Sequence, residues 1–499
     1  MRYLTILFAT LFIAVAALSS CNNQSETLYN IEVKSEISCL ANATEVQLEY
    51  SLRHTSDSNI TVCATTNAEW VTVADNTTQG IIKFAVEDNT NVESRTATIT
   101  LLANGYNSAK ITLTQWGIAP DEANHTLMYL FMGTNLGRYF NTNIEDTTKA
   151  IEQGILGNSN RVVFFRQESK SKGYIAEICY DTDKCCYAVQ IIENIELNNG
   201  LIEAQNVADI IAKMAATAPA KRYGLVCAGH GQAWIPRDVV NSKADIAKFG
   251  AGYNPWIQAE GAETTRAYGE DNTMLNIPEL RNAIELSNVE LDYILFDACF
   301  MANIETVYDL RNVANYIIAS PCEIMGKGFP YTNTLPYLFT DNGNATDYVG
   351  AAESYHHYYR YEYTQNARSA SITVFNCTEV EALADATREV VKSATSEYDI
   401  NKLQTYEGQR THHFYDFGQW VRTVATDAEA LARFNTQFAK AVVKTFTLDS
   451  FYSAYGNYGT YPINRDVYTG VTTSAPSLAY PNAWKQTDWY KDVCAVSEN

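Results

Sequence analysis

Five continuous apolar segments alternate with more polar segments between residues 127 and 319, and this alternation is the strongest constraint on the fold. The apolar segments are 127–132, 161–165, 223–228, 291–296 and 316–319. Between the second and the third, Val207, Ile210, Ile211 and Met214 recur at the spacing of one helix face. Strands that are apolar throughout are buried on both faces. The pattern therefore predicts an α/β fold with a mainly parallel sheet flanked by helices.

Residues 31–116 have a different periodicity, in which apolar and polar side chains alternate with period two. Ala97, Ile99 and Leu101 alternate with threonines, Asn104-Gly105 supplies a turn, and Ile111 and Leu113 alternate again. Short alternating runs joined by Gly-containing turns are typical of hairpins. We expect a small all-β sandwich to precede the α/β domain.

The first residues are typical of an export signal. Met1-Arg2 is a short basic start, and the apolar run from Leu4 to Leu18 is too short to span a bilayer comfortably. The run ends in Leu18-Ser19-Ser20-Cys21, which resembles a bacterial lipobox. We expect residues 1–20 to be a lipoprotein signal peptide, Cys21 to be lipidated and residues 21–30 to be a tether. An ordinary signal peptide with an incidental cysteine is the alternative.

This interpretation implies an exported bacterial lipoprotein that lies in the periplasm, on the outer membrane or on the cell surface. Its lipid would be its only contact with the membrane. The formal net charge of −21 would repel nucleic acid and anionic lipid surfaces, so nucleic acid is not an expected partner. The same charge would attract basic peptides, although solubility alone also explains it. No pair of the remaining cysteines has the C-x2-C spacing of a zinc site, and their disulfide connectivity cannot be read from the sequence.

Two strand ends carry residues of catalytic type. His230 lies between two glycines just after the strand at 223–228, and Cys299 lies just after the strand at 291–296. In an open parallel sheet, ligands bind beyond the carboxyl ends of the strands. We therefore expect the imidazole and the thiol, which are far apart in the sequence, to meet at one edge of the sheet. Flanking glycines allow a sharp turn and a close approach of the backbone to a substrate.

These residues suit nucleophilic catalysis by a thiolate. Cys299 would attack a peptide carbonyl and form a thioester acyl-enzyme, and His230 would move the proton. The backbone amides of Gly231 and Cys299 are the expected donors to the oxyanion. A helix is expected soon after Cys299, and its N-terminus together with an imidazolium would lower the pKa of the thiol.

Other cysteines and histidines compete for these roles. Cys322 also follows a strand end, but no histidine motif accompanies it. Cys227 lies inside an expected buried strand, where inert packing is the simpler interpretation. The pairs His356-His357 and His412-His413 lack the H-E-x-x-H arrangement of a zinc peptidase, so no metal ligand is assigned.

The motifs Gly229-His230-Gly231 and Asp297-Ala298-Cys299-Phe300-Met301 resemble the His and Cys motifs of the clostripain family of caspase-like cysteine peptidases. Residues 319–323 and 328–331 add to the likeness, which spans roughly residues 124–340 and extends less clearly to the C-terminus. The resemblance implies a caspase-like sheet and cleavage after Arg or Lys of a peptide or protein substrate. It assigns the S1 carboxylate to Asp297, and the alternative is a structural aspartate that caps a turn.

The resemblance also implies that some relatives are activated by a cut between the His and Cys strands and that some need calcium. Residues 235–290 form a long insertion with four candidate cut sites, Arg237, Lys243, Lys248 and Arg266. No calcium-loop pattern is present, so calcium ligands cannot be named.

Residues 31–116 resemble the Bacteroidetes-associated carbohydrate-binding often N-terminal (BACON) domain, through Trp70, Arg95 and residues 111–115. Such domains are thought to bind glycans or to act as spacers, and a lone Trp is more often core than a sugar platform. A linker at 117–124 and a peptidase domain at 125–499 complete the expected organisation. The active peptidase is weighed against an inactive surface lipoprotein that binds glycan or protein.

Overall fold

The computed structural model describes residues 29–52, 60–91, 93–118, 122–181, 186–197, 203–237, 260–266, 275–475 and 477–495. The expected signal peptide and Cys21 lie outside these described residues. The chain divides into two compact units, Met1–Ile118 and Ala119–Asn499, each with its own hydrophobic core.

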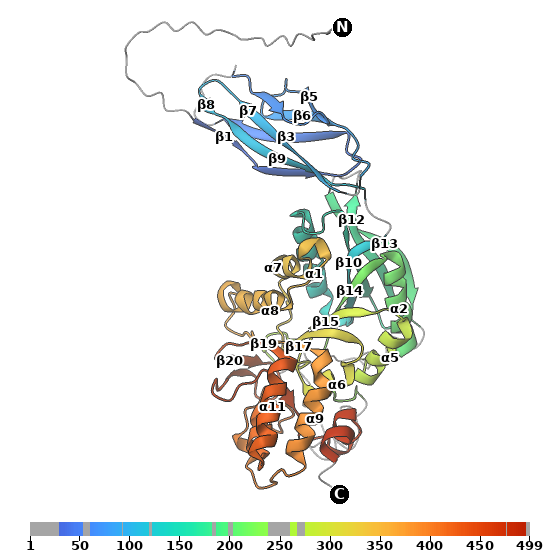
Figure 1. Ribbon diagram of the computed structural model, residues 1–499, viewed down its shortest axis with the longest axis vertical. Helices are drawn as coiled ribbons and strands as arrows, with labels where there is room; N and C mark the ends of the chain where they lie inside the picture. Colours follow the sequence, from blue (N-terminus) through green and yellow to red (C-terminus); the bar gives the residue numbers. More distant parts are fainter. Residues whose placement is uncertain are drawn as a thin grey trace, which may run out of the picture. The chain divides into compact units, whose positions relative to one another are not determined.

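The smaller unit is a sandwich of two β-sheets, as the period-two pattern predicts (Figure 1). One sheet has the order β5-β6-β3-β1-β8 and the other β2-β9-β7-β4. Its strands are β1 (Tyr29–Val33), β2 (Glu36–Cys39), β3 (Glu45–Leu52), β4 (Cys63–Thr66), β5 (Val71–Asp75), β6 (Ile81–Val86), β7 (Arg95–Leu102), β8 (Tyr106–Asn107) and β9 (Ala109–Gln115). Ile99 and Leu101 of β7 and Ile111 and Leu113 of β9 are fully buried between the sheets.

The larger unit is built on a nine-stranded sheet of order β13-β12-β11-β10-β14-β15-β16-β17-β19. Its five central strands are parallel, and antiparallel strands extend it at both ends. The strands are β10 (Ala123–Phe131), β11 (Asn160–Gln167), β12 (Lys172–Asp181), β13 (Cys186–Glu196), β14 (Ala220–Ala228), β15 (Leu291–Asp297), β16 (Ala314–Ala319), β17 (Ile372–Asn376) and β19 (Val442–Phe446). The expected mainly parallel sheet is confirmed, and β10 begins inside the stretch 117–124 that the sequence suggested as a linker.

Helices cover the sheet, and they pack against one another on each side (Figure 1). On one side α7 packs against α1 and α8, and elsewhere α2 packs on α5 and α9 on α11. These helices are α1 (Gly137–Glu152), α2 (Ala204–Thr217), α5 (Ile277–Ser287), α7 (Tyr331–Leu338), α8 (Tyr348–His357), α9 (Val380–Val391) and α11 (Ala428–Ala441). Shorter elements include α6 (Ile304–Leu310), α10 (Phe417–Val424) and β20 (Ser450–Ser453).

The order of the strands creates a crevice at the carboxyl ends of β10 and β14. The chain runs from β10 to β11 on one side of β10 and later returns to place β14 on its other side. Loops that leave two such strands in opposite directions open a crevice at their carboxyl ends, where α/β proteins bind ligands. The loop after β10 and the loop that carries His230 both start there.

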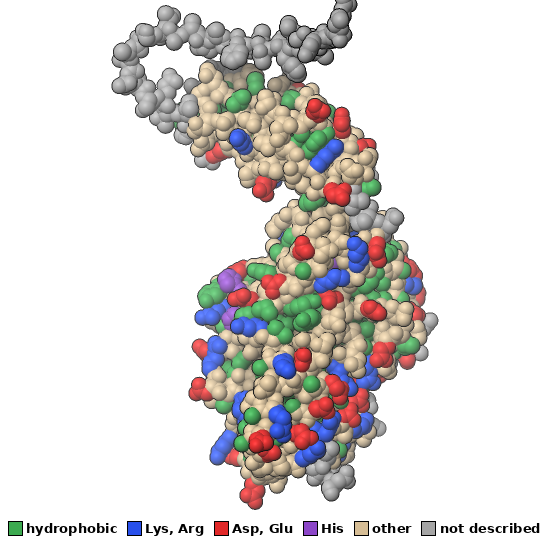
Figure 2. All heavy atoms as spheres, viewed as in Figure 1, with side chains coloured by type: hydrophobic (Ala, Val, Ile, Leu, Met, Phe, Trp, Pro, Cys, Tyr) green, Lys and Arg blue, Asp and Glu red, His purple; other side chains and the backbone are tan. Residues whose placement is uncertain are grey.

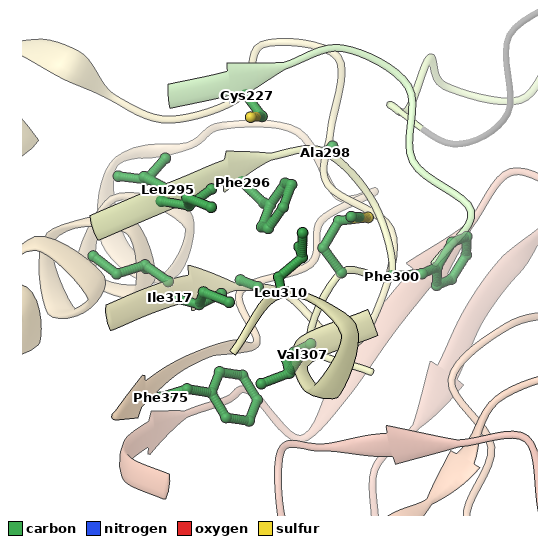
Figure 3. Close-up of a cluster of buried hydrophobic side chains, with 14 of the residues drawn as sticks. Cys227, Leu295, Phe296, Ala298, Phe300, Val307, Leu310, Ile317 and Phe375 are labelled. Atoms are coloured by element: carbon green, nitrogen blue, oxygen red, sulfur yellow. The ribbon is translucent and has the colours of Figure 1, made fainter. Parts of the chain in front are cut away.

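The core beneath this edge is apolar (Figure 3). Phe296 of β15 and Ile317 of β16 point to the same face of the sheet, and they lie beside Val307 and Leu310 of α6. This packing fixes the end of β15, so the residues that follow it start from a rigid base.

Acidic and basic side chains are interspersed on the face of the larger unit shown in Figure 2. The net negative charge is therefore not gathered into one patch on that face. Among the residues that the structure describes, no helix combines the length and apolar character needed to cross a membrane.

Candidate active site

The tips of β14 and β15 lie side by side. The two strands pair in parallel with Ala228 opposite Asp297, and the amide of Gly229 donates to the carbonyl of Asp297 at 3.3 Å. His230 and Cys299 each lie two residues beyond this last pair. The structure thus brings together the two residues that the sequence singled out.

Gly231 packs directly against the backbone of Cys299. A Cβ atom at position 231 would collide with the carbonyl oxygen of Cys299 and would stand 3.0 Å from its amide nitrogen. Only glycine permits this approach, because every other residue carries a Cβ. The glycine after His230 therefore sets the spacing between the two strand tips.

Asn135 contacts the His230 ring, and sequence reasoning missed it. Its Oδ1 lies 2.8 Å from His230 Nε2, and it comes from the loop that follows β10. When Nε2–H donates to this oxygen, Nδ1 is the acceptor nitrogen of the ring. The only signal in the sequence was its position just after a buried strand at the same sheet edge.

The thiol of Cys299 is fully buried. Its Sγ accepts a hydrogen bond from the amide of Ile324 at 3.0 Å. Burial raises the pKa of the thiol well above its usual value, and the nearby carboxyl of Glu323 raises it further. The expected lowering of this pKa is wrong for the uncut chain, because the thiol is buried. The helix N-terminus that was expected to lower it lies further along the chain, since α6 begins only at Ile304.

The chain turns sharply after Cys299. Phe300 has a φ of 64°, a left-handed conformation that is costly for a bulky residue. Its amide donates to the carbonyl of Cys322 at 3.1 Å, and its ring stacks on Phe414 with centroids 4.8 Å apart. These contacts hold a strained residue next to the thiol, where strain is often part of function.

Residues 264–266 of the insertion lie beside Cys299 and pair through their main chain with residues 324–326. Thr265 forms an antiparallel bridge with Met325. The amide of Arg266 donates to the carbonyl of Ile324 at 2.8 Å, and the amide of Gly326 donates to the carbonyl of Thr264 at 2.7 Å. Extended peptides bind to many proteins in this way, through main-chain pairing with an exposed strand.

The carbonyl oxygen of Arg266 lies between the two strand tips. It accepts hydrogen bonds from the amide of Gly231 at 2.9 Å and from the amide of Cys299 at 3.3 Å. The two amides that were assigned to an oxyanion therefore converge on one carbonyl oxygen. This carbonyl belongs to the peptide bond that joins Arg266 to Ala267.

The side chain of Arg266 fills a closed pocket below the cleft. Its Nη1 lies 2.9 Å from Asp297 Oδ2, and both side chains are fully buried. Its Nη2 donates to Asn143 Oδ1 at 2.6 Å and to the carbonyl of Lys327 at 3.2 Å. Nε donates to the carbonyl of Gly326 at 3.1 Å. Each nitrogen of the guanidinium thus has a partner, as a buried cation requires.

Asp297 is held in place for this contact. Its Oδ2 also accepts from the hydroxyl of Tyr331 at 2.8 Å and the amide of Phe329 at 3.2 Å. Burial raises the pKa of Asp297, while the Arg266 guanidinium opposes this shift most strongly. Gly328 has a φ of 74°, and a Cβ there would collide with the guanidinium. Asn143, on α1, is a second pocket residue that sequence reasoning missed, because its helical position marks no ligand site.

The rival residues lie in other environments. Burial raises the pKa values of Cys227 and Cys322 to about 12. Arg237 pairs with Glu279 outside the cleft, and Lys243 and Lys248 fall outside the described residues. No three His, Cys, Asp or Glu side chains gather as a metal site within the described ranges, so no residue is assigned to calcium.

Comparison with known proteins gives a consistent result. The chain matches the model of the clostripain family of C11 peptidases over residues 128–492 and the model of BACON, a putative N-terminal binding domain, over residues 58–115. A secreted C11 cysteine protease from Bacteroides thetaiotaomicron, called iotapain, is 29% identical, with a TM-score of 0.63 over 75% of this chain and 100% of its own. No curated protein matches the sequence.

A second similar structure is described as an inactive zymogen of a C11 protease from Parabacteroides distasonis. It is 26% identical, with a TM-score of 0.61 over 75% of this chain and 99% of its own. A further structure, of a secreted C11 cysteine protease from Bacteroides thetaiotaomicron with an irreversible peptide inhibitor, is 24% identical with a TM-score of 0.61 and supports the fold alone.

Proposed function

Because the chain belongs to the clostripain family and is therefore a cysteine peptidase, we propose that Cys299 is its nucleophile, that His230 is its base and that it cleaves after Arg or Lys. The observation that carries this proposal is the set of contacts that Arg266 makes in the cleft. Its carbonyl meets the amides of Gly231 and Cys299, and its guanidinium meets Asp297. This is the placement that a substrate residue on the acyl side of a scissile bond, the P1 residue, requires.

The chemistry follows from these contacts. His230 takes the proton of Cys299 through Nδ1, while Asn135 holds Nε2. The thiolate attacks the P1 carbonyl carbon, and the oxygen gains negative charge between the amides of Gly231 and Cys299. His230 then gives its proton to the leaving amine, and a thioester remains. Water, deprotonated by His230, attacks the thioester and releases the carboxylate and the thiol.

A carboxylate in a closed pocket explains a basic P1 preference. Asp297 presents a buried charge, so a neutral side chain in its pocket would leave that charge unpaired. The carbonyls of Gly326 and Lys327 add acceptors suited to a guanidinium. Arg makes more of these contacts than Lys because its guanidinium presents five donors in a fork.

The bond after Arg266 is the first expected substrate of this site. Arg266 already occupies the pocket, so an external substrate can enter only after the segment leaves. A similar structure, from Parabacteroides distasonis, is described as an inactive zymogen. We infer that the uncut chain is latent and that a cut after Arg266 frees the pocket.

Peptide reporters test the proposal. The mature chain should hydrolyse Arg and Lys reporters and leave a matched Leu reporter intact, and Cys299→Ala should abolish turnover. Asp297→Asn should lower kcat/KM for Arg reporters by about a hundredfold, since one charged hydrogen bond is lost in a buried pocket. Undiminished turnover by Cys299→Ala would refute the assignment.

The inactive surface lipoprotein was the alternative from another class. The BACON-like unit offers little to a sugar at Trp70, because the Arg95 guanidinium lies 4.4 Å from the ring centroid and covers that face. We therefore propose that this unit is a spacer. Glycan-array binding by the full chain that is lost in Trp70→Ala would contradict the spacer.

We also propose that the chain is an exported lipoprotein held to the membrane through Cys21. In cells, Cys21→Ala should release the protein from the membrane fraction. Intact-mass analysis of the native protein should show a cut before residue 21 and an added lipid. Recovery of the native protein in the soluble fraction would contradict the anchor.

A further inference from the structure

The residue before Arg266 has a polar contact of its own in the cleft. Thr265 donates from Oγ1 to Glu323 Oε2 at 2.6 Å, and both side chains are buried. Thr265 occupies the position that precedes P1 in a substrate, called P2. We propose that Glu323 selects the P2 residue of a substrate, and that the enzyme prefers a side chain with a β-hydroxyl, Thr or Ser, at P2. The inference rests on the proposed function, because Arg266 must mark P1.

Glu323 is fixed by contacts that do not depend on the substrate segment. Ser453 donates its hydroxyl to Oε1, and the amide of Ala454 lies 3.2 Å from Oε1 and 3.0 Å from Oε2. These residues lie at the end of β20, far from the segment in the sequence. Glu323 itself follows the carboxyl end of β16. The donors at Ser453 and Ala454 thus fix the carboxylate, whose Oε2 also accepts from Thr265.

The geometry discriminates among P2 side chains. A valine has nearly the shape of threonine but brings no donor, so Oε2 would lose a hydrogen bond in a site closed to water. A site built to bond a hydroxyl rejects an analogue without one more strongly than an apolar pocket rejects a change in size. An acidic P2 residue would place a second carboxyl against Glu323 in a buried position.

Glu323 also follows Ser320, Pro321 and Cys322 along the edge of the cleft, and the main chain of Ile324 pairs with Arg266. The amide of Ile324 also meets the thiol of Cys299. One short segment therefore holds the sulfur, aligns the backbone of the substrate and contacts its P2 side chain. A P2 residue that fits Glu323 should help to place the scissile carbonyl.

Matched reporters test the inference. Four peptides identical except at P2, with P1 Arg, carry Thr, Val, Ser or Ala. The full-length protein, in the form that hydrolyses Arg reporters, should favour Thr over Val and Ser over Ala by about ten- to a hundredfold in kcat/KM, the usual cost of one unmet buried hydrogen bond to a charged group. In Glu323→Ala the Thr to Val ratio should fall to near one.

The ratio is the decisive readout because it does not depend on how much of a variant is folded. Glu323→Gln keeps the shape of the side chain and gives a second estimate, with a smaller ratio than the native enzyme. Glu305→Gln is the matched control. Glu305 is also a buried glutamate, and it accepts from the hydroxyl of Thr473 at 2.8 Å instead of from Thr265. Its variant should keep the native ratio.

The outcomes separate the two proposals. If no Arg reporter is cut in a Cys299-dependent manner, the proposed function fails. If Arg reporters are cut but the four P2 peptides are hydrolysed equally, or the Val or Ala peptide is preferred, only the inference about Glu323 is overturned. A native ratio retained in both Glu323 variants would also overturn it.

Discussion

The guanidinium of Arg266 lies 2.9 Å from the carboxylate of Asp297, and neither side chain is exposed to solvent. Burying two charges is expensive unless both are paired and further hydrogen-bonded. Here the guanidinium and Asp297 Oδ2 have further partners, whereas Asp297 Oδ1 has none among the described residues. We interpret the pair as a substrate contact, in which Arg266 occupies the place of the basic residue of a substrate.

Arg266→Ala should prevent the cut between the His230 and Cys299 strands, since alanine leaves the Asp297 pocket without a cation. Arg266→Lys should still be cut, but more slowly, because an ammonium makes fewer of the contacts. Gel electrophoresis of the purified chain, with N-terminal sequencing of the fragment that begins after residue 266, measures this.

Arg237→Ala is the control for that experiment. Arg237 lies in the same insertion but pairs with Glu279 away from the cleft, so its variant should be cut normally. A fragment that still begins at residue 267 in Arg266→Ala would contradict the assignment of Arg266 to P1.

Gly231→Ala should lower kcat by at least about a hundredfold, the typical effect of losing one oxyanion donor. The new Cβ collides with the backbone of Cys299, so the amide of residue 231 must move away from the carbonyl that it binds. Reporter kinetics measure the loss, and circular dichroism checks the fold.

Gly137→Ala is a fair comparison for Gly231→Ala. There the added Cβ meets the end of a flexible side chain, Arg166 Nη2, at 3.3 Å. This variant should retain activity, whereas native kinetics in Gly231→Ala would show that the amide is dispensable.

Asn135→Ala should lower kcat by up to about a hundredfold and leave KM nearly unchanged, because the imidazole loses its orientation while the substrate pocket is intact. Asn135→Asp should keep the hydrogen bond and stabilise the imidazolium. Activity should then disappear at a higher pH than in the native enzyme as the pH is lowered. A pH profile of kcat/KM for the three proteins decides the matter, and three superimposed profiles would remove Asn135 from the mechanism.

The thiol of Cys299 should react slowly with iodoacetamide in the uncut chain at neutral pH. Burial raises its pKa well above the usual value, and a raised pKa means less thiolate at any pH below it. Labelling should therefore increase as the pH rises through the alkaline range. Mass spectrometry of the Cys299 peptide measures the rate.

A chain cut after Arg266 should be labelled faster at neutral pH, because departure of the segment exposes the sulfur. Cys322, which is fully buried in the uncut chain and lies outside the segment that is cut, serves as the internal reference. Equal labelling of Cys299 in the cut and uncut chains would contradict the latent state.

Much of the architecture could be predicted from local patterns. The continuous apolar runs at 127–132, 223–228 and 291–296 are buried strands of one sheet, because a strand covered on both faces needs apolar residues at every position. Period-two alternation predicted the sandwich for the corresponding reason. The lowered pKa expected for Cys299 was wrong, since burial depends on what covers the thiol and not on the residues beside it.

The sequence by itself determined where His230, Gly231 and Cys299 stand, because a strand, a turn and a glycine are properties of neighbouring residues. Only the tertiary structure decided which of four basic residues in the insertion fills the Asp297 pocket. It also decided that Asn143 contacts the guanidinium there, that Asn135 contacts the His230 ring and that Glu323 contacts Thr265. Those contacts join segments more than a hundred residues apart in some cases. Local sequence carries no mark of a partner that the fold alone brings within hydrogen-bond distance.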